Sequence, residues 1–292
     1  MNNKVNKEID FLIIGAAKSA TTSLATSLGK HESIHIPKCK EVHFFDIDDN
    51  WERGFEWYKS HFDLGNKVVG EATPSYLSSP SACYRIKKSI GSVKTISVLR
   101  DPIERAYSNY LFSRQYGKFS KGFTETIKDC LRKQGNAYRL LVHPGFYGWH
   151  IRRFISEFES DMCLILTFDE LINETTSALR KIQNHIGVEE KIKNLPRENV
   201  TNKKPKSGEI NSFIKLMRSK YSKKMLYEII PDRVKSKTKN LIINMNTEEM
   251  EEKPQMEKEA FSLLFDKYKS DVDILSEITD LELSDWLCYK KR

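Results

Sequence analysis

Residues 9–22 read IDFLIIGAAKSATT, and this stretch decides the fold. Residues 9–14 are almost all apolar and have the length of a buried strand, which ends at Gly15. Residues 21–28 have a helical composition and are followed by Gly29. An apolar strand, a short polar turn and a helix therefore follow one another directly, as in the first unit of a parallel sheet covered by helices.

The rest of the first half repeats this alternation of strand and helix. Further apolar runs predict strands at residues 67–71, 95–99 and 162–166. Helical patterns lie between or after these runs, at residues 81–90, 103–115, 149–158 and 175–186. The predicted fold class is α/β, a parallel β-sheet flanked by helices on both faces.

We expect a single domain over residues 1–292, because no convincing linker divides the chain. An α/β core at about residues 9–190 carries the motifs. A loop rich in Lys, Asn and Pro follows at about 191–208, and a helical C-terminal part covers about 209–292. In that last part, helices are expected at residues 210–230 and 258–278, with a charged, mobile connector at 247–257.

Composition excludes several protein classes. The chain has 292 residues, a net charge of +8 and 39% hydrophobic residues, which is enough apolar material for a core. No run approaches the roughly 18 apolar residues of a membrane-spanning helix, and no secretory signal pattern is visible, so a cytoplasmic protein is the expectation. The five cysteines are scattered and never spaced as CxxC, which argues against a disulfide framework and against a zinc site.

The turn after the first strand has the features of an anion site. Small residues let backbone N–H groups approach a phosphate, the helix start adds partial positive charge, and Lys18 adds a full one. The turn differs from the nucleotide-triphosphatase loop, whose Lys comes later and whose second Gly is here Ala20. A group with two phosphate-like units and no metal ion fits it better than ATP with magnesium. The alternative is an ordinary small, polar turn. The candidate binding residues are Ala17, Lys18, Ser19, Ala20, Thr21 and Thr22.

A second candidate anion site follows the strand at 95–99. Residues 99–110 read LRDPIERAYSNY, in which Pro102 suits a first helical turn and Ser108 lies about two turns along. Arg100 and Ser108 can together bind a phosphate, the Arg by its planar fork and the Ser by its hydroxyl. The alternative is a structural Arg–Asp pair at a helix start.

Both turns resemble motifs of the sulfotransferases, which take sulfate from 3′-phosphoadenosine 5′-phosphosulfate (PAPS). Residues 18–22 resemble the family's 5′-phosphosulfate loop, Lys-(Ser/Thr)-Gly-Thr-Thr, with Ala20 in place of Gly. Residues 100–110 resemble its 3′-phosphate motif, Arg-Asp-Pro-x-x-Arg-x-x-Ser-x-Tyr. The resemblance implies the P-loop-containing sulfotransferase fold and no metal. PAPS is the implied co-substrate, released as adenosine 3′,5′-bisphosphate (PAP), with Arg100 and Ser108 at its 3′-phosphate.

Three more segments resemble the heparan-sulfate-type, carbohydrate-modifying branch of the family. They are residues 40–46 (KEVHFFD), 70–76 (GEATPSY) and 144–150 (PGFYGWH), and the branch often has Lys where this chain has Ala72. The branch implies Glu41 as general base, with Lys18 stabilising the leaving group. The alternative for Glu41 is a solvated surface carboxylate. The implied catalytic and acceptor residues are Glu41, Lys18, His43, Asp46, Tyr76 and Tyr147.

The basic stretch at residues 199–208 is either a solvated loop or a lid. In the family the corresponding region closes on the donor or on an anionic acceptor, and the resemblance implies donor contacts for Lys203, Lys204 and Ser207. The implied acceptor is a glycan or a glycolipid, modified at a hydroxyl or an amine.

Two rival readings stay open: a P-loop kinase or nucleotidase acting on a small metabolite, and a non-enzymatic binder of nucleic acid or another polyanion. The basic residues are spread along the chain without a recognised nucleic-acid-reading motif, so no nucleic-acid partner is expected.

Overall fold

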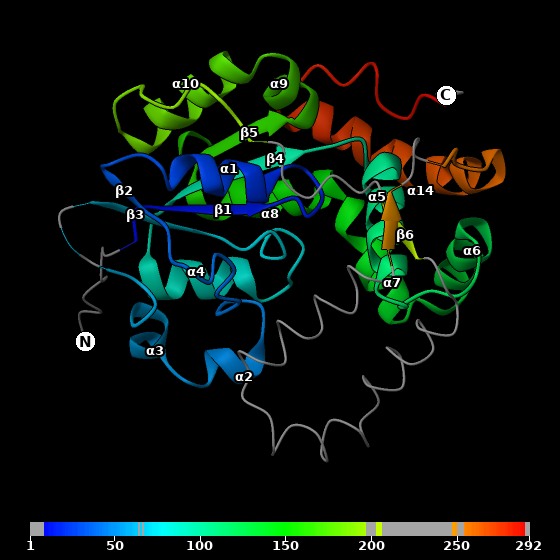
Figure 1. The fold of residues 1–292 in the computed structure, drawn as a ribbon, viewed down its shortest axis with the longest axis horizontal. Helices are drawn as coiled ribbons and strands as arrows, with labels where there is room; N and C mark the ends of the chain where they lie inside the picture. Colours follow the sequence, from blue (N-terminus) through cyan, green and yellow to red (C-terminus); the bar gives the residue numbers. More distant parts are fainter. Residues whose placement is uncertain are drawn as a thin grey trace. The chain divides into compact units, whose positions relative to one another are not determined.

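The computed structural model describes residues 9–63, 65, 67–196, 203–205, 247–249 and 254–289. Its centre is a five-stranded parallel sheet with the order β2-β3-β1-β4-β5 (Figure 1). This sheet confirms the predicted fold class, and four of its strands lie on the predicted apolar runs. Strand β2 has two residues, too few for a pattern to be recognised in the sequence. The strands are β1 (Phe11–Gly15), β2 (Ile34–His35), β3 (Val68–Ala72), β4 (Lys94–Leu99) and β5 (Cys163–Thr167).

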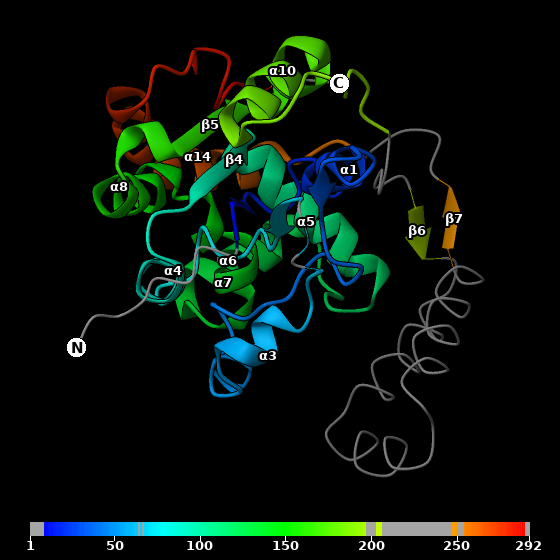
Figure 2. The same ribbon diagram turned by 90° about the vertical axis from the view of Figure 1, so that its left-hand side faces the viewer.

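Helices cover both faces of this sheet, and every residue of β1 is accordingly buried. On one face, α1 (Thr21–Leu28), α9 (Phe168–Asn173) and α10 (Thr175–Ile186) share an apolar cluster with β1 and β4. Helix α8 (Tyr147–Phe158) lies away from α10 and packs against β5 and against α4 (Ala82–Ile90) (Figure 2). Helices α1 and α10 have the predicted bounds. The shorter helices α2 (Asp48–Trp51) and α3 (Phe55–Lys59) lie in the connection between β2 and β3.

Contacts along the chain define two compact units. The first contains the parallel sheet and consists of Met1–Arg105, Val142–Asn199 and Phe265–Cys288. The second consists of Ala106–Leu141, Val200–Leu264 and Tyr289–Arg292. The single domain expected from sequence stays a prediction.

The second unit has an aromatic centre. It contains most of α5 (Pro102–Gln115), together with α6 (Phe123–Lys133) and α7 (Asn136–Leu141). The ring of Phe123 lies 4.9 Å from that of Tyr107 and 5.0 Å from that of Tyr110, between ring centroids. Two short strands of this unit, β6 (Lys203–Pro205) and β7 (Thr247–Glu249), pair antiparallel. The sequence predicts a loop at the position of β6 and a connector at the position of β7. Both strands were missed because their residues are polar, show no alternating hydrophobicity and pair with a segment far away in the chain. The helix expected at residues 210–230 lies outside the described residues.

The C-terminal helix α14 (Lys258–Ile278) has the predicted bounds, and its second half belongs to the first unit. The Asp271 carboxylate accepts hydrogen bonds from the backbone N–H of Gly148 at 2.8 Å and of Trp149 at 2.9 Å, and so caps the start of α8. A Cβ at Gly148 would lie 2.4 Å from the Asp271 carbonyl oxygen, so only glycine allows this approach.

The sheet order brings three strand ends together. Strand β1 lies between β3 and β4, with Ile13 opposite Ala72 and Gly15 opposite Ser97. In parallel strands the carboxyl ends meet at one edge of the sheet, where ligands bind in open α/β folds. The turn after β1, the Arg-Asp-Pro turn after β4 and the Glu71 region of β3 therefore share this edge.

Candidate functional site

The turn between β1 and α1 is built to expose backbone N–H groups. Lys18 and Ala20 have left-handed backbone conformations, with φ of 75° and 59°. Ala20 is the N-cap of α1, and no side chain among the described residues caps the helix start. The first N–H groups of α1 are therefore free of side-chain caps, which leaves them able to donate to an anion.

Three cations meet at this turn. Burial, and after it the positive charges of Arg100 and Lys40, lower the pKa of Lys18 to about 8. The Ser19 hydroxyl is fully buried and has no hydrogen-bond partner among the described residues. Converging positive charge and a buried unpaired hydroxyl both favour a bound anion, which would supply the missing counter-charge and hydrogen-bond partner.

At the end of β4, Asp101 caps the next helix and Arg100 presents its guanidinium beside it. The Asp101 carboxylate caps α5, accepting from the N–H groups of Ile103 at 2.8 Å and of Glu104 at 3.0 Å. Arg100 lies over the Phe168 ring, 4.8 Å from its centroid, and 3.3 Å from a Glu104 carboxylate oxygen. The guanidinium is therefore held on one side by an aromatic face and remains available for a phosphate.

Ser108 is buried, 6% exposed, about two turns into α5. It falls in the second unit, so its place at the 3′-phosphate stays a prediction. Of the predicted lid, Lys203 and Lys204 are described only as part of strand β6, and Ser207 lies outside the described residues.

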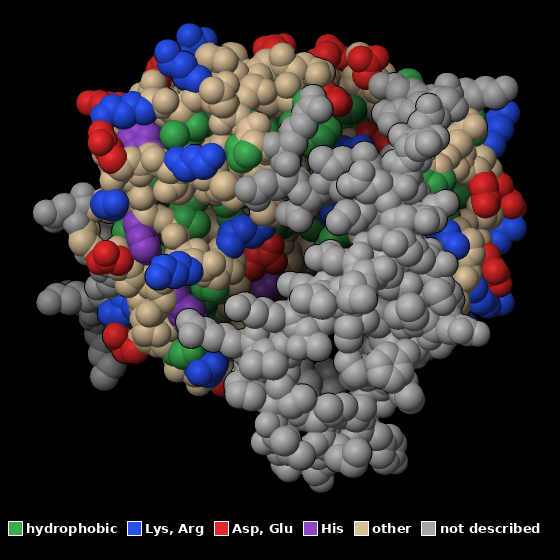
Figure 3. Space-filling model, viewed as in Figure 1, with side chains coloured by type: hydrophobic (Ala, Val, Ile, Leu, Met, Phe, Trp, Pro, Cys, Tyr) green, Lys and Arg blue, Asp and Glu red, His purple; other side chains and the backbone are tan. Residues whose placement is uncertain are grey.

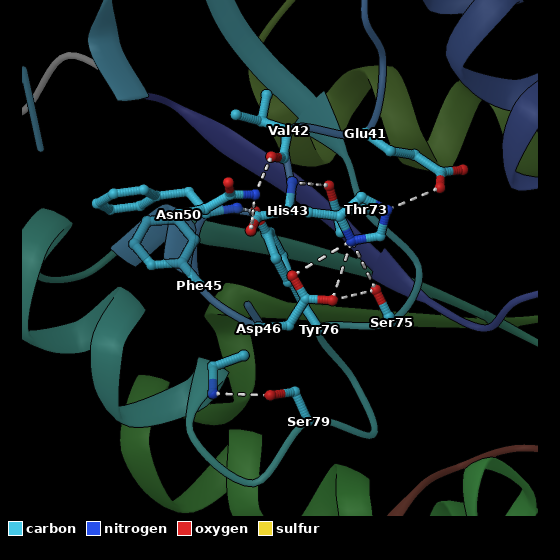
Figure 4. Close-up of polar contacts among 12 residues, drawn as sticks. Glu41, Val42, His43, Phe45, Asp46, Asn50, Thr73, Ser75, Tyr76 and Ser79 are labelled. Atoms are coloured by element: carbon cyan, nitrogen blue, oxygen red, sulfur yellow. Dashed lines mark hydrogen bonds and ion pairs between the residues drawn. The ribbon is translucent and has the colours of Figure 1, made fainter. Parts of the chain in front are cut away.

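Glu41, His43 and Asp46 form a chain of two carboxylates joined by an imidazole (Figure 4). His43 Nε2 lies 3.3 Å from a Glu41 oxygen, and His43 Nδ1 lies 3.0 Å from an Asp46 oxygen. The hydrogen bond with Asp46, and then that with Glu41, outweighs burial and raises the pKa of His43 to about 10. An imidazolium therefore lies between two carboxylates at neutral pH.

Glu41 remains an ionised, accessible carboxylate. Burial would raise its pKa, but hydrogen bonds from His43 and Lys40 outweigh burial and lower the pKa of Glu41 to about 2. Its side chain is 38% exposed, and Lys40 Nζ lies 2.5 Å from its Oε1. The carboxylate can therefore reach a ligand, whereas the Asp46 side chain at the other end of the three groups is only 9% exposed.

Asn50 and Ser75 hold this chain of groups, and neither was predicted from the sequence. The Asn50 amide donates to the carbonyls of Val42 at 3.4 Å and of His43 at 3.0 Å (Figure 4). The Ser75 hydroxyl donates to Asp46 at 2.5 Å. His43 has a left-handed φ of 54°, so these bonds fix a backbone conformation that a non-glycine residue seldom adopts.

A buried carboxylate lies beneath the site, at the end of β3. Glu71 is fully buried, and neither of its oxygens has a well-formed hydrogen bond to any described residue. Burial, and to a smaller extent the Asp46 charge, raise the pKa of Glu71 to about 8, against the opposing effects of the nearby Tyr76 and Thr73 hydroxyls and of His43. At neutral pH this group therefore holds a proton. The sequence did carry a signal for this buried carboxylate. Glu71 ends a strand that is predicted to be covered on both faces, where a charged side chain is unusual.

Tyr76 and Tyr147 are fully buried. The Tyr76 hydroxyl accepts a hydrogen bond from the Phe44 N–H at 3.1 Å, which ties residues 40–46 to the turn after β3. Burial raises the pKa of Tyr147 to about 12. Contact of either residue with an acceptor stays a prediction.

Among the described residues, no group of three or more His, Cys, Asp or Glu side chains is arranged to hold a metal ion. Within the same residues, none of the helices combines the length and apolar character needed to cross a membrane. Basic and acidic side chains are intermixed over the face drawn in Figure 3.

Comparison with known proteins gives consistent matches. The family model described as "Sulfotransferase domain" matches residues 8–261. The membrane-associated sulfotransferase kil1 of Dictyostelium discoideum is 38% identical over 117 residues, covering 38% of this chain and 24% of that protein. Heparan sulfate glucosamine 3-O-sulfotransferase 5 of Mus musculus is 28% identical, covering 62% of this chain and 54% of that protein.

This chain therefore spans about half the length of the mouse relative, with 54% covered, and a smaller part of the Dictyostelium one. Among solved structures, a sulfotransferase from Alicyclobacillus acidocaldarius superposes with a TM-score of 0.68 at 21% identity, covering 95% of this chain and 98% of that one. That likeness establishes the fold.

Proposed function

The chain belongs to the sulfotransferase family, and from this premise we propose that it moves a sulfuryl group from PAPS to a hydroxyl, or an amine, of a carbohydrate or glycolipid. The observation that carries the proposal is that an anion-binding turn and an ionised carboxylate meet at one sheet edge. Lys40 Nζ contacts both, at 3.0 Å from Thr22 Oγ1 and 2.5 Å from Glu41 Oε1.

The donor is held by its two charged ends. The turn at residues 15–22 suits the 5′-phosphosulfate, with Lys18 and the first N–H groups of α1 as donors. Arg100, at the end of the neighbouring strand β4, suits the 3′-phosphate. Ser19 fits this assignment, because its buried hydroxyl gains a partner when a phosphate oxygen enters the turn.

The reaction is an in-line displacement at sulfur. The acceptor oxygen forms a bond to sulfur and gives its proton to the Glu41 carboxylate. The bond from sulfur to the bridging oxygen of the 5′-phosphate breaks, and PAP leaves with the electron pair. Negative charge grows on that bridging oxygen, where Lys18 and the backbone N–H groups stabilise it. As in phosphoryl transfer, the protein contributes mostly position and charge.

The acceptor class rests on the relatives. The mouse relative is named for the 3-O position of heparan sulfate glucosamine. We extend the sugar acceptor to this chain because residues 40–46 bring Glu41, His43 and Asp46 together in one hydrogen-bonded chain. A cytoplasmic location stays a prediction.

Transfer of radiolabelled sulfate from PAPS tests this function directly. The panel contains a desulfated heparan oligosaccharide, a galactosyl glycolipid and a simple phenol. We expect label on one of the two sugar-containing acceptors and little on the phenol. Binding of PAP is measured on the same sample by calorimetry. A protein that binds PAP but labels only the phenol has another acceptor class, whereas one that neither binds PAP nor transfers label refutes the proposal.

A further inference from the structure

Lys40 joins the donor turn and the base through one ammonium group. Its Nζ donates to Thr22 Oγ1, in the first turn of α1, and forms an ion pair with Glu41 Oε1. The side chain is 21% exposed, so the ammonium is shielded yet open on one side.

The backbone of Lys40 is fixed independently of this side chain. Its N–H donates to the Pro37 carbonyl at 2.9 Å, and its carbonyl accepts from Ala72, the last residue of β3, at 3.3 Å. Lys40 has a left-handed φ of 52°, so its position depends on these two bonds. Its side chain therefore starts from an anchored point at the sheet edge and can change partner without moving the backbone.

In this arrangement Glu41 is a weak base. Hydrogen bonds from His43 and Lys40 hold its pKa at about 2, against the effect of burial. A general base works best when its pKa lies nearer the working pH. Binding of the donor changes this balance, because the phosphosulfate brings negative charge to a turn where Lys40 already lowers the pKa of Lys18.

We propose that Lys40 is a further catalytic residue, which turns its ammonium from Glu41 to the sulfuryl oxygens of the bound donor. An ammonium has three N–H donors, so Lys40 keeps Thr22 while it changes its other partner. One movement then has two results: positive charge reaches the group being transferred, and the Glu41 carboxylate is released to accept the acceptor's proton. This inference rests on the proposed function, because the sulfuryl group belongs to that donor.

Comparing the binding of PAPS with that of PAP tests whether Lys40 contacts the sulfuryl group, because only PAPS carries that group. Affinities for both are measured by calorimetry on the wild type, Lys40→Met and Lys40→Arg. Lys38→Met is the matched control, since Lys38 is an exposed lysine two residues away. Removing a charge-assisted hydrogen bond should weaken PAPS binding by about tenfold or more. We expect PAP binding within twofold of wild type, with Lys40→Arg in between for PAPS.

Each other result overturns the inference. Equal losses for PAPS and PAP would mean that Lys40 only supports the donor turn through Thr22, and unchanged PAPS binding would mean that it does not reach the sulfuryl group. A wild type that binds neither nucleotide refutes the proposed function itself, which is a different outcome. The thermal unfolding midpoint of each variant establishes that a loss reflects the missing ammonium, and Lys40→Arg supplies the comparison if Lys40→Met is unstable.

Discussion

Replacing Glu71 by Gln should stabilise the protein, and increasingly so as the pH rises. Glu71 is fully buried, and its pKa is raised from 4.5 to about 8, first by burial and then by Asp46. In the unfolded chain the same carboxyl ionises near its ordinary pKa. Between these two values, unfolding releases a proton, so the wild type loses stability as the pH rises from about 4.5 to about 8.

The magnitude follows from that difference. Each pH unit within the window costs about 1.4 kcal/mol. Linkage between the two pKa values gives a loss of about 2–3 kcal/mol between pH 5 and pH 7. Gln keeps the shape of a protonated Glu and does not ionise, so Glu71→Gln removes this loss. Its amide can donate to the hydroxyls of Tyr76 and Thr73, which lie beside the carboxyl.

Urea unfolding at pH 5, 6 and 7 measures this effect. The stability difference between Glu71→Gln and wild type should widen steadily over the series, in favour of the variant. Glu56→Gln is the control, because the Glu56 side chain is 84% exposed and should leave the shape of the curve unchanged. If wild type and Glu71→Gln lose stability in parallel, Glu71 is ionised in the folded protein and the assignment of a buried proton is wrong.

Three further predictions concern the reaction site. Glu41→Gln should lower turnover by about 10²–10⁴, because the proton acceptor is lost, while calorimetry should find PAP affinity nearly unchanged; normal turnover would exclude Glu41 as base. Lys18, whose pKa is about 8 through burial and the charges of Arg100 and Lys40, must be protonated to hold the donor. PAP affinity should therefore fall about tenfold per unit above pH 8, and Lys18→Met should bind weakly without that fall. Arg100→Ala should weaken PAP much more than adenosine 5′-phosphate; equal losses would remove Arg100 from the 3′-phosphate.

The strand ends could be predicted from the sequence because parallel strands buried on both faces leave a strong signal. The runs before Gly15 and Arg100 are mostly apolar, and each is followed by a polar turn and a helix. Their alternation places Lys18 and Arg100 at one edge of the sheet, and the pairing of β1 with β4 confirms it. The predicted bounds of α1, α10 and α14 match the structure because their apolar positions recur with helical spacing.

The candidate catalytic segment, residues 40–46, could not be derived in this way. Residues 40–46 contain no helix or strand, so no period marks them, and only their resemblance to a known motif singled out Glu41. The parts of the site that sequence reasoning missed act through tertiary contacts. Asn50 reaches back to the carbonyls of Val42 and His43, and Ser75 reaches Asp46 across 29 positions of the chain. Neither contact leaves a local pattern.

Lys40 lies next to Ala72, the position at which this chain differs from the heparan-sulfate-type motif. The resemblance implies that this branch often has a lysine at position 72, which is here the last residue of β3. Here Ala72 is fully buried, and its N–H donates to the carbonyl of Lys40. The same strand end is thus bonded to a residue whose ammonium already touches Thr22 and Glu41. The Lys40 ammonium therefore brings a positive charge to the sheet edge at which Ala72 lies.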